Sequence, residues 1–460
     1  MGALYAGMMK LVWLLAWAAW LPGDCVPARW PADAATLPLL DNSPINCLLV
    51  EAGEIKPDFR AAAAKRTVLA VVHPGSEEQA AGALKAGADG LVLEGDFAPE
   101  ERARLLKLDA KAIELRSRAH MDFTRGGVLG TAQAVWPGIN THDQKGAAES
   151  GPTGAPWIDT NAGFLRFARA LAPEGTVVWL GNRPPAKTVI QAERYIQVIA
   201  DAAMIGARWV LALDDDFFAR LRAGDTKAHA GWRRIQQVLA FYENNSSWRT
   251  LKPYGQLAVV QDADTGGLLS GGILDMISVK HTPVVPVPKR GLATANLAGV
   301  KMTVNVDATA LTDEQKKKLL AFTRGGGTLL SGPPGWRMPP PDALRITLAK
   351  EDVSKLDDIW REVNTLTGRR NLGARLFNVA SMLSHLTANA DATSVVLHLV
   401  NYSGYPVDSV TVHLLGKFRS ARLVTPEEPA GKALKLYDHE DGSGVDIDTV
   451  TSVAALILER

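Results

Sequence analysis

Carboxylate side chains stand at the ends of several apolar segments in the first half of the chain. These residues are Glu51, Glu94, Asp96, Glu114, Asp214, Asp215 and Asp216. Two carboxyl groups that flank a glycosidic bond can cleave it, one as the general acid and the other as a nucleophile or base. In barrels of parallel strands, catalytic groups project from the carboxyl ends of the strands. A pair of these carboxylates could therefore carry general acid–base chemistry of this kind.

The elements that would position these carboxylates lie between residues 45 and 245, where short apolar segments alternate with amphipathic ones. We predict strands at 46–51, 67–73, 90–95, 111–115, 128–136, 176–182 and 208–216. Apolar strands that alternate with helices predict a parallel sheet buried on both faces. Seven such units favour a closed (β/α)8-like barrel over an open sheet. No eighth strand is evident, so we expect an irregular or incomplete barrel.

Two smaller domains are predicted after the barrel domain, which we place at 29–250. Residues 251–345 read as a small Rossmann- or flavodoxin-like α/β domain. Its Gly325–Gly327 turn follows a helix and precedes a strand, which is the wrong order for a phosphate-binding loop. Residues 346–390 are predicted to be a helical linker. From 391 to 460 the apolar residues alternate with period two, which predicts an antiparallel β-sandwich.

The first 28 residues resemble a secretory leader. Lys10 precedes the apolar run 11–21, and small residues surround Ala28, so we expect a signal peptide cleaved after Ala28. The run is too short to span a bilayer comfortably. The protein would then be secreted or periplasmic, without stable membrane insertion. The alternatives are an uncleaved membrane anchor and a lipoprotein site at Cys25, which Asp24 disfavours.

The chain has two cysteines, Cys25 and Cys47. Cleavage after Ala28 would leave Cys47 alone as a small core residue. If Cys25 survives, a bridge between the two would pin the N-terminal arm to the first predicted strand. Two cysteines exclude a cysteine-rich zinc site, and we expect no metal and no organic cofactor. A formal charge of +1 without a basic block argues against a nucleic-acid partner.

The order of barrel, α/β domain and sandwich resembles the trimeric β-galactosidases and several hypothetical glycosidase families. The segments that carry the resemblance are 151–171, 310–336 and 395–416. It implies a catalytic barrel, a carbohydrate substrate and a glutamine-amidotransferase-like second domain that serves assembly, and hence a homo-oligomer. Amidotransferase chemistry needs a cysteine nucleophile. No cysteine follows Cys47, so the second domain does not perform that reaction.

The resemblance places the acid/base after the fourth barrel strand and the nucleophile on the seventh. By position these residues are Glu114 and Asp214. The family pattern has Asn before the acid/base, where this chain has Ile113, and a Glu nucleophile, where this chain has an Asp run. The residues themselves leave alternatives open. Glu114 could form a salt bridge with Arg116, Arg118 or a barrel neighbour, and the Asp run could cap the helix that follows it.

The predicted sugar pocket combines aromatic rings, on which apolar sugar faces stack, with polar groups for the hydroxyls. Its residues are Trp136, Trp157, Asp159, Asn161, Arg183 and Asp215. The alternative for the tryptophans is an ordinary place in the core. The leading prediction is therefore an exported glycoside hydrolase with a two-carboxylate mechanism. The alternatives are a catalytically inactive glycan-binding or envelope scaffold protein, and a metal-assisted hydrolase that joins the Asp run to His120 or His142.

Overall fold

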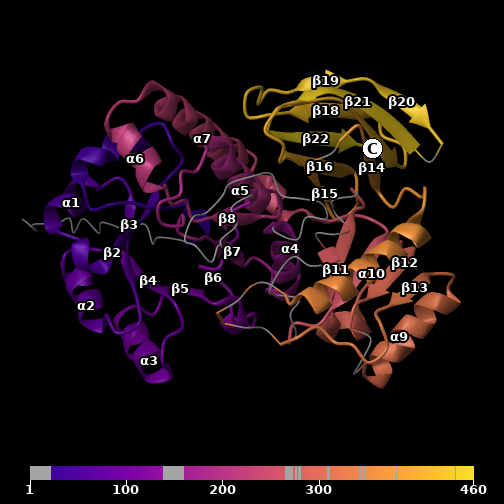
Figure 1. Cartoon of the computed structure of the whole chain (residues 1–460), viewed down its shortest axis with the longest axis horizontal. Helices are drawn as coiled ribbons and strands as arrows, with labels where there is room; N and C mark the ends of the chain where they lie inside the picture. Colours follow the sequence, from indigo (N-terminus) through magenta and orange to yellow (C-terminus); the bar gives the residue numbers. More distant parts are fainter. Residues whose placement is uncertain are drawn as a thin grey trace, which may run out of the picture.

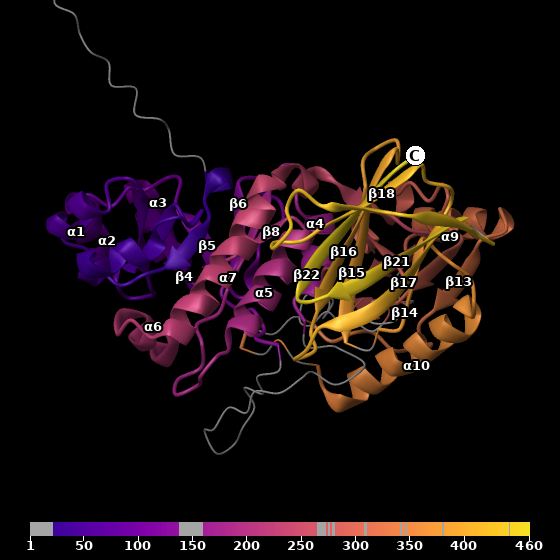
Figure 2. The ribbon, with the colours of Figure 1, turned by 90° about the horizontal axis from the view of Figure 1, so that it is seen from above.

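The computed structural model comprises a barrel, an α/β domain and a β-sandwich (Figure 1). The residues that it describes are 22–137, 160–264, 273–274, 277, 281–307, 311–340, 343–344, 346, 348–379, 381–440 and 442–460. Figure 2 shows the α/β domain and the sandwich on the same side of the barrel. No helix in these ranges has the length and apolar character needed to cross a membrane.

Eight parallel strands form the barrel in sequence order. They are β1 (Pro27–Arg29), β2 (Cys47–Glu51), β3 (Thr67–Val72), β4 (Gly90–Glu94), β5 (Ile113–Arg116), β6 (Val128–Thr131), β7 (Val177–Leu180) and β8 (Ala207–Trp209). Leu211, just after β8, closes the seam against β1: its N–H donates to Pro27 O at 3.1 Å, and its carbonyl accepts from Arg29 N at 2.7 Å. The predicted barrel is confirmed, and its missing strand comes first instead of last.

The segment just before β1 is joined to β2 by a disulfide between Cys25 and Cys47. The bridge matches the alternative in which Cys25 survives in the folded protein. Residues 1–21 lie outside the described ranges, so the leader stays a prediction. A cut after Ala28 would take Pro27 and Ala28 out of β1 and Cys25 out of the disulfide.

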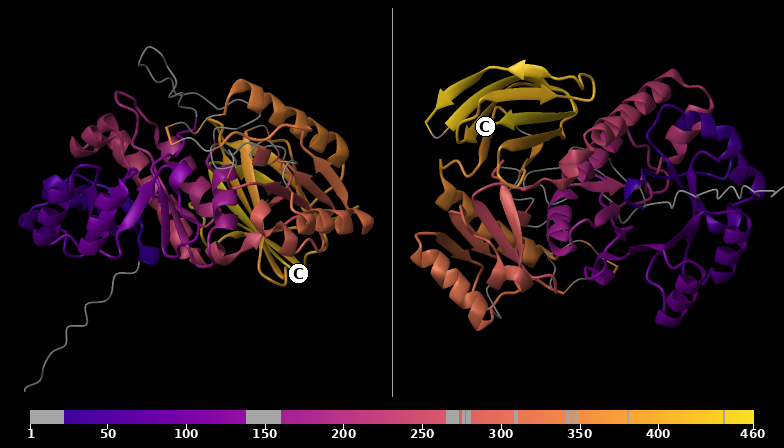
Figure 3. Two further views of the ribbon diagram at one scale, coloured as in Figure 1. Left: turned by 90° about the horizontal axis from the view of Figure 1, so that it is seen from below. Right: turned by 180° about the vertical axis from the view of Figure 1, so that it is seen from behind.

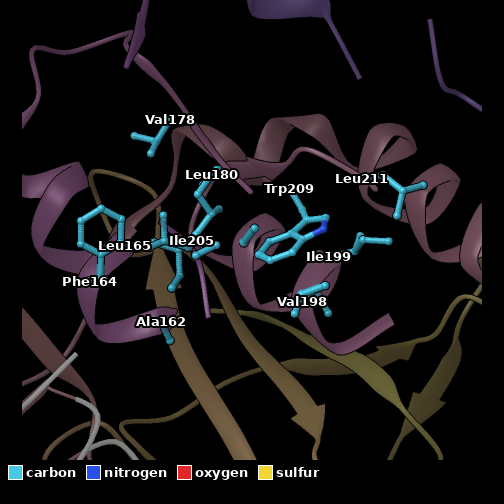
Figure 4. Packing of buried hydrophobic residues seen from close by; sticks show 14 of the residues in the cluster. Ala162, Phe164, Leu165, Val178, Leu180, Val198, Ile199, Ile205, Trp209 and Leu211 are labelled. Atoms are coloured by element: carbon cyan, nitrogen blue, oxygen red, sulfur yellow. The ribbon is translucent and has the colours of Figure 1, made fainter. Parts of the chain in front are cut away.

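Seven helices flank the barrel strands in the described ranges. They are α1 (Pro57–Ala62), α2 (Glu77–Lys85), α3 (Pro99–Leu108), α4 (Ala162–Leu171), α5 (Ala192–Met204), α6 (Asp215–Arg222) and α7 (Thr226–Asn244). Figure 4 shows the packing beside β7 and β8, where Phe164 of α4 and Val198 of α5 lie among other apolar side chains. The connection between β5 and β6 holds only a 3-10 turn, Arg118–His120, so the barrel is irregular there as expected.

The α/β domain has a parallel sheet with the order β11-β10-β12-β13, which is flavodoxin-like as predicted. Its strands are β10 (Leu257–Gln261), β11 (Val284–Pro288), β12 (Met302–Asn305) and β13 (Thr328–Ser331). The helix α9 (Asp313–Arg324) begins with a capping box between Thr312 and Gln315. A second helix, α10 (Lys350–Thr367), lies across the sheet in Figure 1. The Gly325–Gly327 segment is the turn between α9 and β13.

The sandwich consists of two antiparallel sheets, as predicted, with the orders β14-β17-β21-β20 and β19-β18-β22-β16-β15-β9. The strands are β9 (Lys252–Pro253), β14 (Ala374–Phe377), β15 (Met382–Ala388), β16 (Ser394–Asn401), β17 (Val407–Leu415), β18 (Ser420–Val424), β19 (Lys432–Leu434), β20 (Leu436–His439), β21 (Gly442–Val450) and β22 (Val453–Glu459). Both β14 and β15 lie in the segment predicted as a helical linker, of which α10 is the helical part.

Polar contacts fix the barrel to the sandwich, which lies beside α4 and α5 in Figure 3. Arg166 of α4 is buried and donates from Nη2 to Ser384 O of β15 at 2.8 Å. Its Nε also donates to His385 Nδ1 at 3.4 Å. From α5, Gln197 Nε2 donates to Asn401 O at 3.0 Å. The barrel wall and the sandwich therefore share one buried interface.

Candidate functional site at the barrel mouth

A polar layer closes the carboxyl end of the barrel interior. The apolar cluster inside the barrel includes Leu49 of β2, Val71 of β3 and Val92 of β4. Side chains alternate between the two faces of a strand, so the residues two positions later face inward as well. Those residues are Glu51, His73 and Glu94.

The layer is held together by ion pairs that link distant strands. Arg29, at the end of β1, binds Glu94, at the end of β4, through two contacts of 2.7 and 2.8 Å. Their side chains are only 9% and 12% exposed, so little water competes for this pair. Glu51 lies 3.1 Å from His73 Nε2 and also contacts Arg183, which follows β7. The ends of five barrel segments, β1 to β4 and the loop after β7, are thus linked through two glutamates.

A third carboxylate, Asp96, lies just beyond β4. It pairs with His120 Nδ1 at 2.8 Å and accepts a hydrogen bond from Ser117 N at 3.2 Å. Burial opposes ionisation of Asp96, but the hydrogen bonds from Ser117 and His120 outweigh it and keep the pKa of this carboxyl below its usual value. His120 is therefore occupied by Asp96.

A pocket of about 430 Å³ opens beside this layer. It is lined by Arg29, by the loop 183–189 after β7 and by residues 212–216 after β8. Three residues predicted from sequence, Arg183, Asp214 and Asp215, lie here together. None of the lining residues in the described part of the chain is aromatic.

Asp214 is a helix cap, the alternative considered for the Asp run. Its Oδ1 accepts from Phe217 N at 3.0 Å, and its Oδ2 accepts from Tyr195 Oη at 2.7 Å and Ile190 N at 3.3 Å. The residue is 3% exposed. Its two oxygens thus tie the start of α6 to α5 and the loop before it, so Asp214 holds the pocket wall in place. Asp215, the next residue, is exposed.

Glu114 lies on the outer face of β5, away from the barrel interior. Its neighbours Ile113 and Leu115 fill the barrel interior, so Glu114 points outward. Arg102 of α3 holds it bidentately at 2.6 and 2.7 Å, and Arg125 adds a contact of 2.9 Å. This placement matches the structural salt bridge considered as its alternative, although the arginines are different ones. The structure does not bring Glu114 and Asp214 together.

Trp136 and Asn161, which were also predicted for the sugar pocket, lie elsewhere. Trp136 is 1% exposed and packs edge-on against Tyr195 and Trp209, which is the core role considered as its alternative. Asn161 is buried and clamps Val135 through two hydrogen bonds, of 2.8 and 2.9 Å. Trp157 and Asp159 fall outside the described residues, as does His142.

Beneath Asn161 lies a fully buried carboxyl, Asp201 of α5. Its Oδ2 accepts from Asn161 N at 2.9 Å. Burial raises the pKa of Asp201 to about 6, even though this hydrogen bond and the charge of Arg166 favour the ionised form. Asp201 therefore belongs to the packing between α4 and α5, away from the mouth.

Counting β1 shifts every strand position by one. The fourth strand is β4, which ends at Glu94, and the seventh is β7, which is followed by Gly181 and Asn182. The assignment of Glu114 and Asp214 by strand position therefore falls one strand too far along the chain. The sequence signal that points to Glu51 and Glu94 is the period-two spacing that places them on the inward face of their strands.

The described residues hold no group of three or more His, Cys, Asp or Glu side chains arranged to bind a metal ion. The Asp run lines the pocket wall, and His120 is bonded to Asp96 instead. The described part of the mouth thus offers ion pairs in place of a cluster of metal ligands.

Comparison with solved structures shows a glycosidase-type barrel fold. The alpha-L-fucosidase isoenzyme 2 from Paenibacillus thiaminolyticus matches with a TM-score of 0.57 at 11% identity, over 93% of this chain and 96% of the fucosidase. A rhamnosidase from a Novosphingobium species matches with a TM-score of 0.44 at 12% identity, over 89% of this chain and 40% of the other. A beta-galactosidase from the psychrophilic Marinomonas ef1 matches with a TM-score of 0.37 at 12% identity, over 88% and 65%. No family model and no curated protein matches the sequence.

Proposed function

We propose that this protein is an exported glycoside hydrolase whose oligo- or polysaccharide substrate binds at the carboxyl-end mouth of the barrel. The observation that carries the proposal is the pair of inward-facing glutamates, Glu51 and Glu94, in one polar layer beside an open pocket. They take the place of Glu114 and Asp214 as the carboxyl groups of a two-carboxylate mechanism. The fucosidase-like fold supports the reaction class alone.

The contacts of the two glutamates assign them different roles. Glu94 accepts two N–H groups from one guanidinium, which is how an ionised carboxylate is held, so it is the nucleophile or base. Glu51 contacts His73 and the pocket-loop Arg183 and is not clamped by a single guanidinium, so we assign it as the acid. Arg183 is about half exposed and lies on the pocket loop. Its contact with Glu51 is therefore the one that an incoming sugar opens.

A second candidate is a glycan-binding protein without hydrolytic activity. The observation that favours it is that both oxygens of Glu94 are already bonded to Arg29 and that no carboxylate follows directly after β7. A mouth of this kind would bind a sugar without cleaving it.

The experiment is hydrolysis of a panel of aryl glycosides and plant polysaccharides by the purified chain and three variants. Glu51→Gln and Glu94→Gln should each lower kcat roughly a hundredfold or more, because each removes one partner of the acid–base pair. Glu114→Gln is the matched control, since it removes an ion-paired glutamate that faces outward, and it should leave kcat within a factor of two or so of the wild type.

Three results separate the candidates. Loss of turnover in Glu114→Gln alone would make Glu114, on β5, a catalytic carboxylate. Turnover that none of the variants affects would show that neither Glu51 nor Glu94 is catalytic. Absence of turnover on every substrate, with sugar binding retained, would establish the second candidate.

We further propose that the α/β domain is amidotransferase-like and serves assembly of a homo-oligomer. The support is its flavodoxin-like strand order together with the lack of any cysteine after Cys47. Light scattering of the purified chain would test this, since a monomeric mass at micromolar concentration would refute it.

A further inference from the structure

A row of rings crosses the outer face of the sandwich sheet β14-β17-β21-β20. The ring of His413, on β17, has its centre 4.8 Å from that of Phe377 on β14. On the other side, its centre lies 3.6 Å from that of His439 and 6.3 Å from that of Tyr437, both on β20. Phe377 and Tyr437 are 37% and 36% exposed, so the row faces solvent from one edge of the sheet to the other.

Two glycines in β21 make the row possible. Gly442 and Gly444 stand opposite His439 and Tyr437 in the strand register. A Cβ atom on Gly444 would lie 2.1 Å from Cε2 of Tyr437, so the tyrosine ring rests on this glycine. Because β21 carries no side chain at either position, the rings of β20 reach across it towards His413.

Charged groups of both signs border the rings. Asp446 accepts from Thr411 Oγ1 at 2.7 Å and lies 3.5 Å from Tyr437 Oη. The guanidinium carbon of Arg375 lies 5.5 Å from the centre of the Phe377 ring. The charges near the row therefore include both signs, and the rings offer flat apolar surface between hydrogen-bond donors and acceptors.

We propose that this surface, which we name the ring row (Phe377, His413, Tyr437 and His439), binds an extended, uncharged polysaccharide. The apolar faces of sugar rings pack on aromatic rings, while sugar hydroxyls exchange hydrogen bonds with Asp446 and its neighbours. The row spans three strand spacings of about 4.8 Å, roughly 14 Å, which suits a chain more than a single sugar. An anionic polymer would require a basic patch, whereas the charges here are mixed.

The ring row lies on a different domain from the barrel mouth, so the inference does not depend on hydrolysis by the barrel. A second binding surface of this kind would hold the protein on a polysaccharide and raise the local concentration of chain ends and branches near the mouth. The ligand of the ring row is thus the main chain of a polysaccharide, whether or not the barrel cleaves that polysaccharide.

The test is retention of the full chain on insoluble cellulose and insoluble xylan, with affinity electrophoresis in soluble xylan and β-glucan. Tyr437→Ala and Phe377→Ala should each weaken binding roughly tenfold or more, because each removes a stacking ring. Tyr437→Phe keeps the ring and should bind like the wild type. Tyr405→Ala is the matched control, because Tyr405 is 66% exposed in the loop between β16 and β17 and lies outside the row.

Two further variants isolate the geometry and the domain. Gly444→Ala leaves Tyr437 in the sequence but displaces its ring, and it should lose binding to the same extent as Tyr437→Ala. Glu94→Gln should bind like the wild type, so a failure of the barrel proposal leaves this result unchanged. Binding by Tyr437→Ala equal to that of the wild type, or no retention of the wild type on any of the four polymers, would overturn the inference.

Discussion

At the scale of single residues, neighbouring acidic side chains in this chain have different structural roles. Asp214 and Asp215 are adjacent, yet the first is buried with both oxygens bonded and the second is exposed. The sequence shows only a run of three aspartates, which is compatible with a cap, a ligand set or a catalytic group. Which oxygen meets which donor depends on where Tyr195 lies, and that position is set by packing between distant segments.

Replacing Asp214, the N-cap of α6, should mainly lower the stability of the fold. We expect Asp214→Ala to lower the free energy of unfolding by about 2 kcal/mol, because it removes the N-cap of α6 and leaves the Tyr195 hydroxyl without its acceptor. Asp215→Ala should change it by less than about 0.5 kcal/mol. Urea denaturation of both variants measures the difference. Equal effects would mean that Asp214 is not the cap.

Asp201 predicts a specific pH dependence of stability. Its pKa is raised to about 6 in the folded protein by burial, so its contribution to stability is fully present below its unfolded pKa of 3.8 and is lost as the pH rises through about 6. Asp201→Asn does not titrate. Relative to the wild type, the variant should therefore lose more stability at pH 4 than at pH 7, by up to about 3 kcal/mol. Denaturation at the two pH values checks this, and a constant difference would contradict it.

At the scale of elements, β1 is the strand that sequence patterns did not reveal. It has three residues, too few for a periodic signal, and it directly follows a segment that reads as a leader. The other seven strands were predictable because each lies in a segment rich in apolar residues, although β5 alternates them with charged ones. The antiparallel strands from β16 onward were predictable from alternation, whereas β14 and β15 were hidden in a segment dominated by the helical pattern of α10.

The disulfide should matter for the barrel seam. Cys25 and Cys47 are 22 positions apart, and linking them removes conformational freedom from the unfolded chain. We expect Cys25→Ser combined with Cys47→Ser to lower stability by about 3 kcal/mol. N-terminal sequencing of the mature protein should also show Cys25 retained. A mature terminus at Arg29 would be incompatible with the seam seen between β1 and Leu211.

At the scale of the whole molecule, the domains share more core than their sequence boundaries indicate. One continuous apolar cluster joins residues of the barrel, of the α/β domain and of the sandwich, among them Trp209, Val304 and Val400. The predicted boundaries followed changes in hydrophobic period, which report local structure. Contacts between domains, such as Arg166 with the β15 backbone, carry no periodic signature and could not be predicted from it.

The shared core predicts one cooperative unfolding event. Calorimetry of the full chain should show a single transition, and Arg166→Met should lower its midpoint without splitting it, because the arginine connects α4 to β15. Lys252→Met, which removes an exposed pair with Glu174, is the control and should leave the midpoint nearly unchanged. Two separate transitions in the wild type would show that the domains unfold independently.

The position of β1 has a consequence for how the chain is made. Synthesis delivers β1 first, but its second neighbour, the segment at Leu211, emerges about 180 residues later by position in the chain. Until then β1 has a partner on one side only and an open edge on the other, where another chain could pair. Cys47 emerges long before Leu211, so an oxidising compartment can tether the strand to β2 while the rest of the barrel is still being translated. The barrel is thus begun with a covalent link and completed by its last strand.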